Sequence, residues 1–578
     1  MKNIQRLIAA LALLGMLGVS PASAAGGAMS AHASFTALAH EFFYWGFSVE
    51  PSGATSVGVH TYDSKLDDMS AGSIARGLRT LNAYLGKFEA ISPSTLSADD
   101  ALDRTLILNQ IRDQLLDLQT RQVWRHNPDM YTGIASGSIF SLISRDFAPL
   151  PVRMKDAIAR ERAIPAMFKH AEANVTTVDA MTKEIAQEQA QGGVGFFKET
   201  VPLAFSSVHD AVLQAQFKSA NDGAAAALAA YAAWIGKIKP SGTYAIGTDA
   251  YEKKLQYEDA LNMSVSQYLS YGERALARTR VQFIATAKRI NPKQTPQQVY
   301  NSLASSYPPP SQLLAKATSD LVRLRAFVIA HHYVTMPSDA SIKVIPTPPF
   351  ERAFITAAED SPGPLETIAT QAYYYVTPPD PSWPAARVAG FMAQFNNYEF
   401  PIISAHEVYP GHFTNFAIDK HLNLSLTRKL SSSSEYAEGW AHYGEQTMVD
   451  LGWGNGDPRV RLSQLEEALL RECRYVAGVK LHTAGWTVPQ AEQLFETQCF
   501  QTPAVALEES MRGTQDPMYG YYTLGKLMIL KLRADYKRKL GSAYTLEKFH
   551  DAFLAHGDPP IPLLRPFILG ASDDGKPL

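Results

Sequence analysis

The sequence predicts a mainly α-helical protein, and three observations support this. Apolar residues recur at helical spacing along many segments of moderate length. Proline-marked joints separate these segments, and strand-like runs are confined to one region after residue 340. No internal repeat with a period of about 20 to 50 residues is present. This pattern indicates a large helical architecture rather than strands alternating with helices.

Composition narrows the class of protein. The chain has 578 residues, of which 46% are hydrophobic and 19% charged, with a formal net charge of -3. A chain of this length exceeds one ordinary core, so a large fold or two lobes is expected. We expect an N-terminal helical part over 25–340 and a C-terminal part over 341–578. Without a basic field, nucleic acid is not an expected partner.

The first 24 residues resemble an export signal. Lys2 and Arg6 precede an apolar run from Leu7 to Val19, and Ala22-Ser23-Ala24 forms a small-residue cleavage site. No cysteine follows that site, so a lipid-anchored form is not indicated. No later segment has about 18 uninterrupted apolar residues. We therefore expect an exported protein, in a periplasm or outside the cell, without a membrane span.

Helix signals follow one another along the N-terminal part. Ser34 and Ser97 are candidate N-caps, and Pro165 is expected to kink or restart its helix. Asn291-Pro292 is expected to end one long helix. Helices are expected over 34–45, from 98 onwards, and over 158–175, 223–238, 265–290 and 311–332.

The residue pattern changes near Ser341, where runs with high β-propensity begin. Lys343-Val344-Ile345 and Tyr373-Tyr374-Tyr375-Val376 are expected to form strands. The second run has two compatible interpretations. It could be a short core strand, or an edge strand beside the site that pairs with an extended peptide and brings Tyr374 to the substrate.

A histidine motif indicates a catalytic zinc site. His406 is followed by Glu407, and His412 comes six residues after His406. A catalytic zinc ion takes three protein ligands and leaves a position for water, and a neighbouring carboxylate can accept a proton from that water. In the common H-E-x-x-H form, the two histidines lie four residues apart on one helix face. Here a regular helix would rotate the second histidine by about 240°.

Pro410 and Gly411 explain how both histidines could still face one ion. Proline removes a backbone hydrogen bond and clashes with the carbonyl group of His406, and glycine adds backbone freedom. The helix is therefore expected to widen or break over Tyr409 to Gly411, which could bring His412 back towards His406.

Glu438 is the expected third ligand. Glu445 follows it by seven residues on the same helix face and could orient a ligand histidine. Spacing alone leaves Glu435 and His442 open as rival ligands.

These paired motifs resemble the bacterial domain-of-unknown-function 885 family, over about residues 35–570. The residues that carry the resemblance are His406-Glu407-x-x-Pro410-Gly411-His412 and Glu438-Gly439-Trp440-Ala441-x-Tyr443-x-Glu445. The resemblance implies a helical, zincin-like metallopeptidase fold with a deep cleft. It also implies a distant similarity to thimet oligopeptidase, angiotensin-converting enzyme and Taq carboxypeptidase.

The C-terminal part supplies candidates for the remaining chemistry. A tyrosine or histidine could donate to the developing oxyanion, and Tyr522 and His482 match family positions, with Tyr519 as a third choice. Arg512 or Lys526 could hold a substrate carboxylate. Cys473 and Cys499 fall on consecutive expected helices and could form a disulfide or stay as two thiols.

The sequence therefore predicts an exported Zn²⁺-dependent peptidase for short peptides, of carboxypeptidase or oligopeptidase type. In this hypothesis His406, His412 and Glu438 hold zinc, and Glu407 is the general base. Two alternatives stay open: a zinc hydrolase of a non-peptide amide, and a peptide-binding protein without catalysis. An intact Glu407 disfavours the second, because binding needs no general base.

Overall fold

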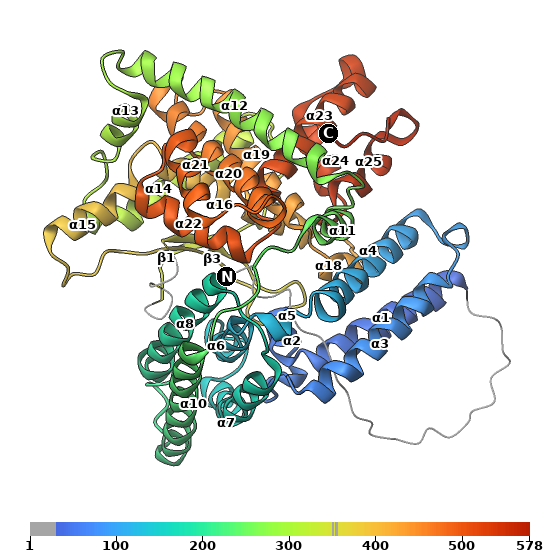
Figure 1. Cartoon of the computed structure of the whole chain (residues 1–578). Helices are drawn as coiled ribbons and strands as arrows, with labels where there is room; N and C mark the ends of the chain where they lie inside the picture. Colours follow the sequence, from blue (N-terminus) through green and yellow to red (C-terminus); the bar gives the residue numbers. More distant parts are fainter. Residues whose placement is uncertain (1–29, 349–351, 353–355) are drawn as a thin grey trace. The chain divides into compact units, whose positions relative to one another are not determined.

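The computed structural model describes residues 30–348, 352 and 356–578. The expected export signal lies outside these residues. The described chain is mainly α-helical with one small sheet, as predicted (Figure 1). None of its described helices is both long and apolar enough to cross a membrane.

Internal contacts divide the chain into two units. Unit 1 comprises the described residues up to Tyr244 together with Gly363–Ala369 and Ser425–Leu430, and unit 2 comprises the rest. The main boundary between the units follows Tyr244. The boundary expected from the sequence lies near Ser341, where the small sheet begins.

Unit 1 is built from helices, with α10 packed against both α7 and α8. Its helices are α1 (Ala31–Val49), α2 (Pro51–Ser56), α3 (Ala71–Glu89), α4 (Ala98–Leu115), α5 (Val123–His126), α6 (Asp129–Ile143), α7 (Leu150–Asn174), α8 (Ala180–Gly195), α9 (Val201–Ala204), α10 (Ala211–Lys237) and α18 (Leu426–Leu430). Pro165 lies inside α7, which runs through it as one helix, so the helix does not restart there. Ser97 caps α4 by accepting from the Asp100 amide, which confirms that prediction. The prediction for Ser34 is wrong, because Ser30 caps α1 one turn earlier.

Unit 2 contains the remaining helices, with α20 packed against α12, α21 and α22 (Figure 1). Its helices are α11 (Thr248–Glu258), α12 (Val265–Ile290), α13 (Pro296–Leu303), α14 (Leu313–Ala330), α15 (Ala385–Met392), α16 (Phe400–Glu407), α17 (His412–Asp419), α19 (Ser434–Asp450), α20 (Pro458–Thr483), α21 (Val488–Cys499), α22 (Pro503–Gln515), α23 (Tyr521–Leu540), α24 (Leu546–Leu554) and α25 (Ile561–Leu569). The bounds of α12 agree with the predicted range 265–290, because a capping box at Ser264 starts the helix and Asn291 ends it.

The sheet of unit 2 has the strand order β1-β3-β2. β1 (Ile342–Pro346) pairs with β3 (Ala372–Val376) in parallel, and β2 (Ala357–Asp360) pairs with β3 antiparallel. Because β3 has a neighbour on each side, the edge-strand interpretation of Tyr373–Val376 is wrong and the core-strand interpretation is confirmed. Tyr374 is fully buried, and its hydroxyl group is hydrogen-bonded to Ser404 at 3.0 Å.

Helices α19 and α23 pack closely enough to exclude side chains at their crossing. A Cβ atom on Gly439 would lie 2.5 Å from the Cα atom of Gly525. A Cβ atom on Gly525 would lie 1.7 Å from the carbonyl oxygen of Glu435. Glycine is therefore required at both positions. The crossing places Glu438 of α19 and Tyr522 of α23 within a few residues of one contact point.

Candidate metal centre

The helix that carries His406 breaks where the sequence predicted. α16 ends at Glu407 and α17 begins at His412. Between them the Gly411 amide donates to the Ala405 carbonyl oxygen at 2.9 Å. A Cβ atom on Gly411 would lie 1.7 Å from the carbonyl oxygen of His406, so only glycine fits. The break brings the rings of His406 and His412 to a centroid separation of 4.8 Å.

Glu438 lies against both histidines. Its Oε2 atom is 3.3 Å from Nε2 of His406 and 3.2 Å from Nε2 of His412. Two ligand atoms that each lie about 2.0–2.1 Å from one zinc ion at a tetrahedral angle are about 3.3–3.4 Å apart. The two measured separations agree with that spacing, so these imidazole and carboxylate groups fit a metal ion in both chemistry and geometry.

Glu407 stands beside the same group of atoms. Ligand atoms of His406, Glu407 and His412 all lie within 4.8 Å of one another. Oε2 of Glu407 accepts a hydrogen bond from the Glu359 amide of β2 at 3.0 Å. Either Glu407 or Glu438 is therefore near enough to complete a ligand set. Glu438 is the better ligand, because a single one of its oxygens contacts both histidines.

Glu445 contacts His406 from the other side of the ring, a contact that its expected orienting role requires. Its Oε1 atom is 2.7 Å from Nδ1 of His406, and its Oε2 atom is 3.0 Å from Nδ1 of His442. Nη2 of Arg471 lies 3.3 Å from the same Oε1. Burial raises the pKa of Glu445, but the charge of Arg471 and the contacts with His442 and His406 outweigh burial and hold that pKa well below its usual range. Glu445 is therefore ionised.

The pKa of His406 responds to the two carboxylates. Burial lowers this pKa, but the hydrogen bonds to Glu438 and Glu445 outweigh burial and raise it to about 9. Without a cation, the ring is therefore protonated at neutral pH. A metal ion would take the place of the proton on Nε2.

The two rival ligands have other partners. Oε1 of Glu435 accepts from the Ile561 amide at 2.7 Å. His442 lies between Glu445 and the Lys526 ammonium group, which is 3.1 Å from its Nε2. Burial, together with the charge of Lys526, lowers the pKa of His442 to about 3, so this ring is neutral. The side chains of Glu435 and His442 are therefore engaged elsewhere than with the cluster of His406, His412 and Glu438.

Of the predicted oxyanion donors, Tyr522 has a ring contact with His406. Its ring centroid is 6.3 Å from that of His406, and the guanidinium groups of Arg471 and Arg474 each lie 5.3 Å from its ring. His482 follows Arg471 by eleven residues on α20, a displacement of about 16 Å along a helix. Its Nε2–H donates to the Gly513 carbonyl oxygen at 2.8 Å. The ring of Tyr522 therefore lies beside His406, whereas His482 is hydrogen-bonded to Gly513.

Three of the four substrate-binding candidates are committed to internal contacts. Tyr374 is in the core beside Ser404. The Tyr519 hydroxyl donates to Glu509 and is fully buried. Lys526 is buried against His442, and burial lowers its pKa. Arg512 on α22 differs from these three because it is only half-buried.

Sequence reasoning missed Arg471, Arg474 and the Glu359 amide. Arg471 and Arg474 lie three residues apart on one face of α20, a spacing that could have indicated a shared role. Arg474 is paired with Glu509 through two hydrogen bonds of 2.8 and 2.6 Å. The Glu359 contact carried no sequence signal, since it uses a backbone group.

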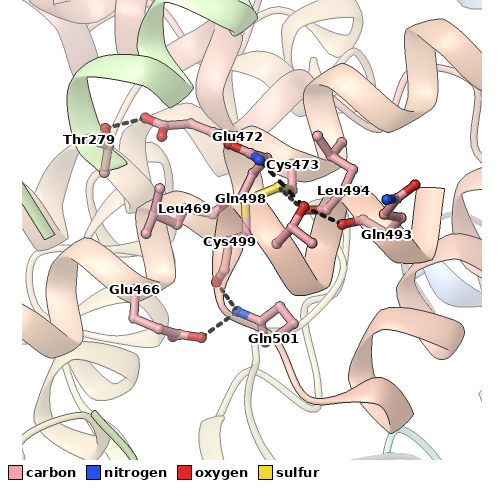
Figure 2. The surroundings of a disulfide bond; sticks show 11 residues. Thr279, Glu466, Leu469, Glu472, Cys473, Gln493, Leu494, Gln498, Cys499 and Gln501 are labelled. Atoms are coloured by element: carbon pink, nitrogen blue, oxygen red, sulfur yellow. Dashed lines mark hydrogen bonds between the residues drawn. A yellow bond between two sulfur atoms is a disulfide. The ribbon is translucent and has the colours of Figure 1, made fainter. Parts of the chain in front are cut away.

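A disulfide joins Cys473 to Cys499, which resolves the alternative left open above (Figure 2). It ties α20 to the end of α21, one residue away from Arg474. Glu472 accepts from Thr279 of α12 at 2.7 Å, and Gln501 donates to Glu466 at 2.6 Å (Figure 2). The segment of α20 that faces the centre is thereby fastened to two neighbouring elements.

The fold and the cluster define a mainly α-helical protein with two histidines and a carboxylate converging on one point. The chain belongs to the family described as bacterial protein of unknown function, DUF885, whose model matches residues 51–568. The family predicted from the motifs is thus confirmed. No curated protein matches the chain.

Two solved structures share the fold over nearly the whole chain. One is provisionally described as a lipoprotein of unknown function from Shewanella oneidensis, with 24% identity, a TM-score of 0.79, and coverage of 94% of this chain and 100% of that one. The other is provisionally described as a lipoprotein from Colwellia psychrerythraea, with 17% identity, a TM-score of 0.72, and coverage of 95% and 100%. At these identities the likeness shows the fold alone.

Proposed function

We propose that this protein is an exported Zn²⁺-dependent peptidase that hydrolyses short peptides. The observation that carries the proposal is the placement of Glu438 Oε2 at 3.3 and 3.2 Å from the Nε2 atoms of His406 and His412. His406, His412 and Glu438 would hold the ion. A zinc ion in such a site polarises a carbonyl group and lowers the pKa of a water molecule at its open position.

Glu407 is the proposed general base. Its Oε2 atom is engaged by the Glu359 amide, which fixes the carboxylate beside the ligand cluster. The carboxylate would accept a proton from the attacking water and deliver it to the leaving amine.

Glu445 and Arg471 are proposed to position His406. With Nδ1–H of His406 donating to Glu445, the lone pair of Nε2 is directed at the cluster. Arg471 keeps Glu445 ionised and in turn contacts Glu467. The ring is therefore held in one tautomer and one orientation.

Tyr522 is proposed to donate to the oxyanion that develops on the substrate carbonyl. Two arginines flank its ring, and the ring is buried apart from a small exposed fraction of 8%. A hydroxyl group fixed in a water-poor site stabilises developing negative charge more strongly than one in solvent.

Export is supported by two independent features. The disulfide between Cys473 and Cys499 is typical of proteins that fold in oxidising compartments. The residues before position 25 carry the signal pattern described above. We propose a periplasmic or secreted location, and the two structural neighbours described as lipoproteins are compatible with it.

The test compares Glu407→Gln with the wild type. The variant is expected to keep its zinc and to lose peptide cleavage by about 10²- to 10⁴-fold, since only the proton acceptor is removed. Metal content is measured by mass spectrometry, and cleavage is measured on a pool of N-acetylated pentapeptides. Glu508→Gln, an exposed glutamate on α22, is the matched control and should leave both readouts unchanged.

Full hydrolysis by Glu407→Gln would remove Glu407 from its proposed role. A wild type that binds zinc but cleaves only non-peptide amides would identify a different hydrolase. A wild type without stoichiometric metal would favour the peptide-binding alternative.

A further inference from the structure

Three arginines surround the tyrosines next to the candidate centre, and two of them are neutralised within the protein. Arg471 has salt bridges with Glu445 and Glu467. Arg474 binds the carboxylate of Glu509 with two N–H groups. These two cations therefore have their counter-ions in place.

Arg512 is the third arginine, and no carboxylate of the described chain lies within salt-bridge distance of it. Its Nη2 donates to the Tyr521 hydroxyl at 3.3 Å, and its Cζ atom lies 5.0 Å from the centroid of the Tyr519 ring. The nearby acids have other partners: Glu509 is bound by Arg474, and Asp516 accepts from Tyr521 at 3.2 Å. Arg512 is half-buried, so part of the residue is exposed to solvent.

The guanidinium group is connected to the centre through two neighbouring tyrosines. The rings of Tyr521 and Tyr522 are 4.7 Å apart, and Tyr522 is 6.3 Å from His406. Each residue of an extended peptide spans about 3.4 Å, so a chain cleaved at the centre would reach Arg512 within a few residues.

We propose that Arg512 binds the free C-terminal carboxylate of the peptide substrate, which makes the enzyme a carboxypeptidase that releases a short C-terminal fragment. This inference rests on the proposed peptidase function. A planar guanidinium group matches a carboxylate through two parallel N–H···O bonds, and an amide or an internal peptide bond offers no such pairing. Tyr521 fixes the guanidinium in place by accepting from one of its N–H groups.

The test uses two pools of N-acetylated pentapeptides, one with free C-termini and one with C-terminal amides. The wild type is expected to cleave the free acids with a kcat/KM about 10- to 100-fold higher, which corresponds to one charged hydrogen-bonded pair. Arg512→Gln should lower kcat/KM for the free acids, mainly through KM, until the ratio between the two pools approaches one. Arg459→Gln, a 46% exposed arginine that contacts Asp457, is the matched control and should preserve the ratio.

Equal cleavage of both pools by the wild type would overturn the proposal, as would an Arg512→Gln variant that keeps the wild-type ratio. If the wild type cleaves neither pool, the proposed peptidase function is wrong. The role of Arg512 is then tested by measuring how tightly the protein binds each peptide pool. In that case zinc-loaded Glu407→Gln should retain the free-acid pool more tightly than the amide pool. Addition of Arg512→Gln should abolish that preference, and equal retention of both pools would reject Arg512 as the carboxylate receptor.

Discussion

Each unit buries several arginines, and Arg160 of unit 1 and Arg471 of unit 2 contact different kinds of groups. In unit 1, Arg160 is fully buried and donates to the carbonyl oxygens of Lys65, Ser138 and Pro51 and to the hydroxyl group of Thr55. In unit 2, Arg471 instead contacts carboxylates, and one of these contacts leads through Glu445 to His406.

The difference shows why a buried charge alone does not identify a functional site. The hydrogen bonds of Arg160 end on backbone and hydroxyl groups, so they hold segments of unit 1 together and leave nothing for a ligand. Arg471 contacts Glu445, and Glu445 contacts Nδ1 of His406. The other nitrogen of that ring, Nε2, faces Glu438, and the ring packs against His412. Ligand-type atoms that face one another mark the candidate site, and the buried cation only supports them.

The largest expected effect separates the two arginines. Arg160→Leu should lower the free energy of unfolding by about 3–5 kcal/mol, because buried acceptors lose their donor. The zinc affinity of the folded protein should not change. Arg471→Leu should lower both the free energy of unfolding and the zinc affinity. Chemical denaturation and a chelator-competition titration give the two readouts, and a loss of zinc affinity in Arg160→Leu would break the comparison.

The next effect concerns a buried acid of unit 1 that lacks the hydrogen bonds and ion pair that Glu445 has. Glu161 is fully buried, and neither of its carboxylate oxygens has a hydrogen-bond partner among the described residues. Burial raises its pKa from 4.5 to about 9. In the unfolded chain this group ionises near pH 4.5, but in the folded protein it stays protonated up to about pH 9. Stability should therefore fall as the pH rises between these values.

Glu161→Gln should remove that pH dependence. At pH 7 the variant should be more stable than the wild type by up to about 3 kcal/mol, and the advantage should vanish near pH 4. Thermal melts over pH 4 to 9 measure it. A variant that is no more stable than the wild type at pH 8 would show that Glu161 has a partner in solution.

The smallest effect tests the support of His406. Glu445→Gln should weaken zinc affinity by about 10- to 100-fold, the usual result of removing a carboxylate that orients a ligand histidine. Glu161→Gln serves as the matched control, a buried glutamate changed in the same way in the other unit. Unchanged zinc affinity in Glu445→Gln would mean that the contact at Nδ1 does not support metal binding.

Sequence patterns predicted those parts of the molecule that depend on local chemistry. Asn291 ends α12 as expected, because a helix stop signal acts within one turn. Pro410 and Gly411 predicted the break between α16 and α17 for the same reason, and Glu445 was expected to orient a histidine from its helical spacing to Glu438.

Contacts that depend on packing could not be predicted. The sequence of β2, Ala357–Asp360, has little β-propensity, and this segment is a strand only because it pairs with β3. Tyr519 was the third choice as oxyanion donor, and only packing shows that it is bound to Glu509 while Tyr522 lies beside His406. Arg471 was missed because an arginine in a helix is usually solvated, and only the fold brings it to Glu445. The predicted deep cleft around the site stays a prediction.

Zinc stoichiometry tests the central claim most directly. Purified wild-type protein, loaded and then freed of loosely bound metal, should hold one zinc ion per chain. His412→Ala should hold none, while His421→Ala, which changes a half-exposed histidine paired with Asp339, should keep the wild-type amount. A wild type that holds no stoichiometric metal, or a His412→Ala variant that holds as much zinc as the wild type, would contradict the metal centre built from His406, His412 and Glu438.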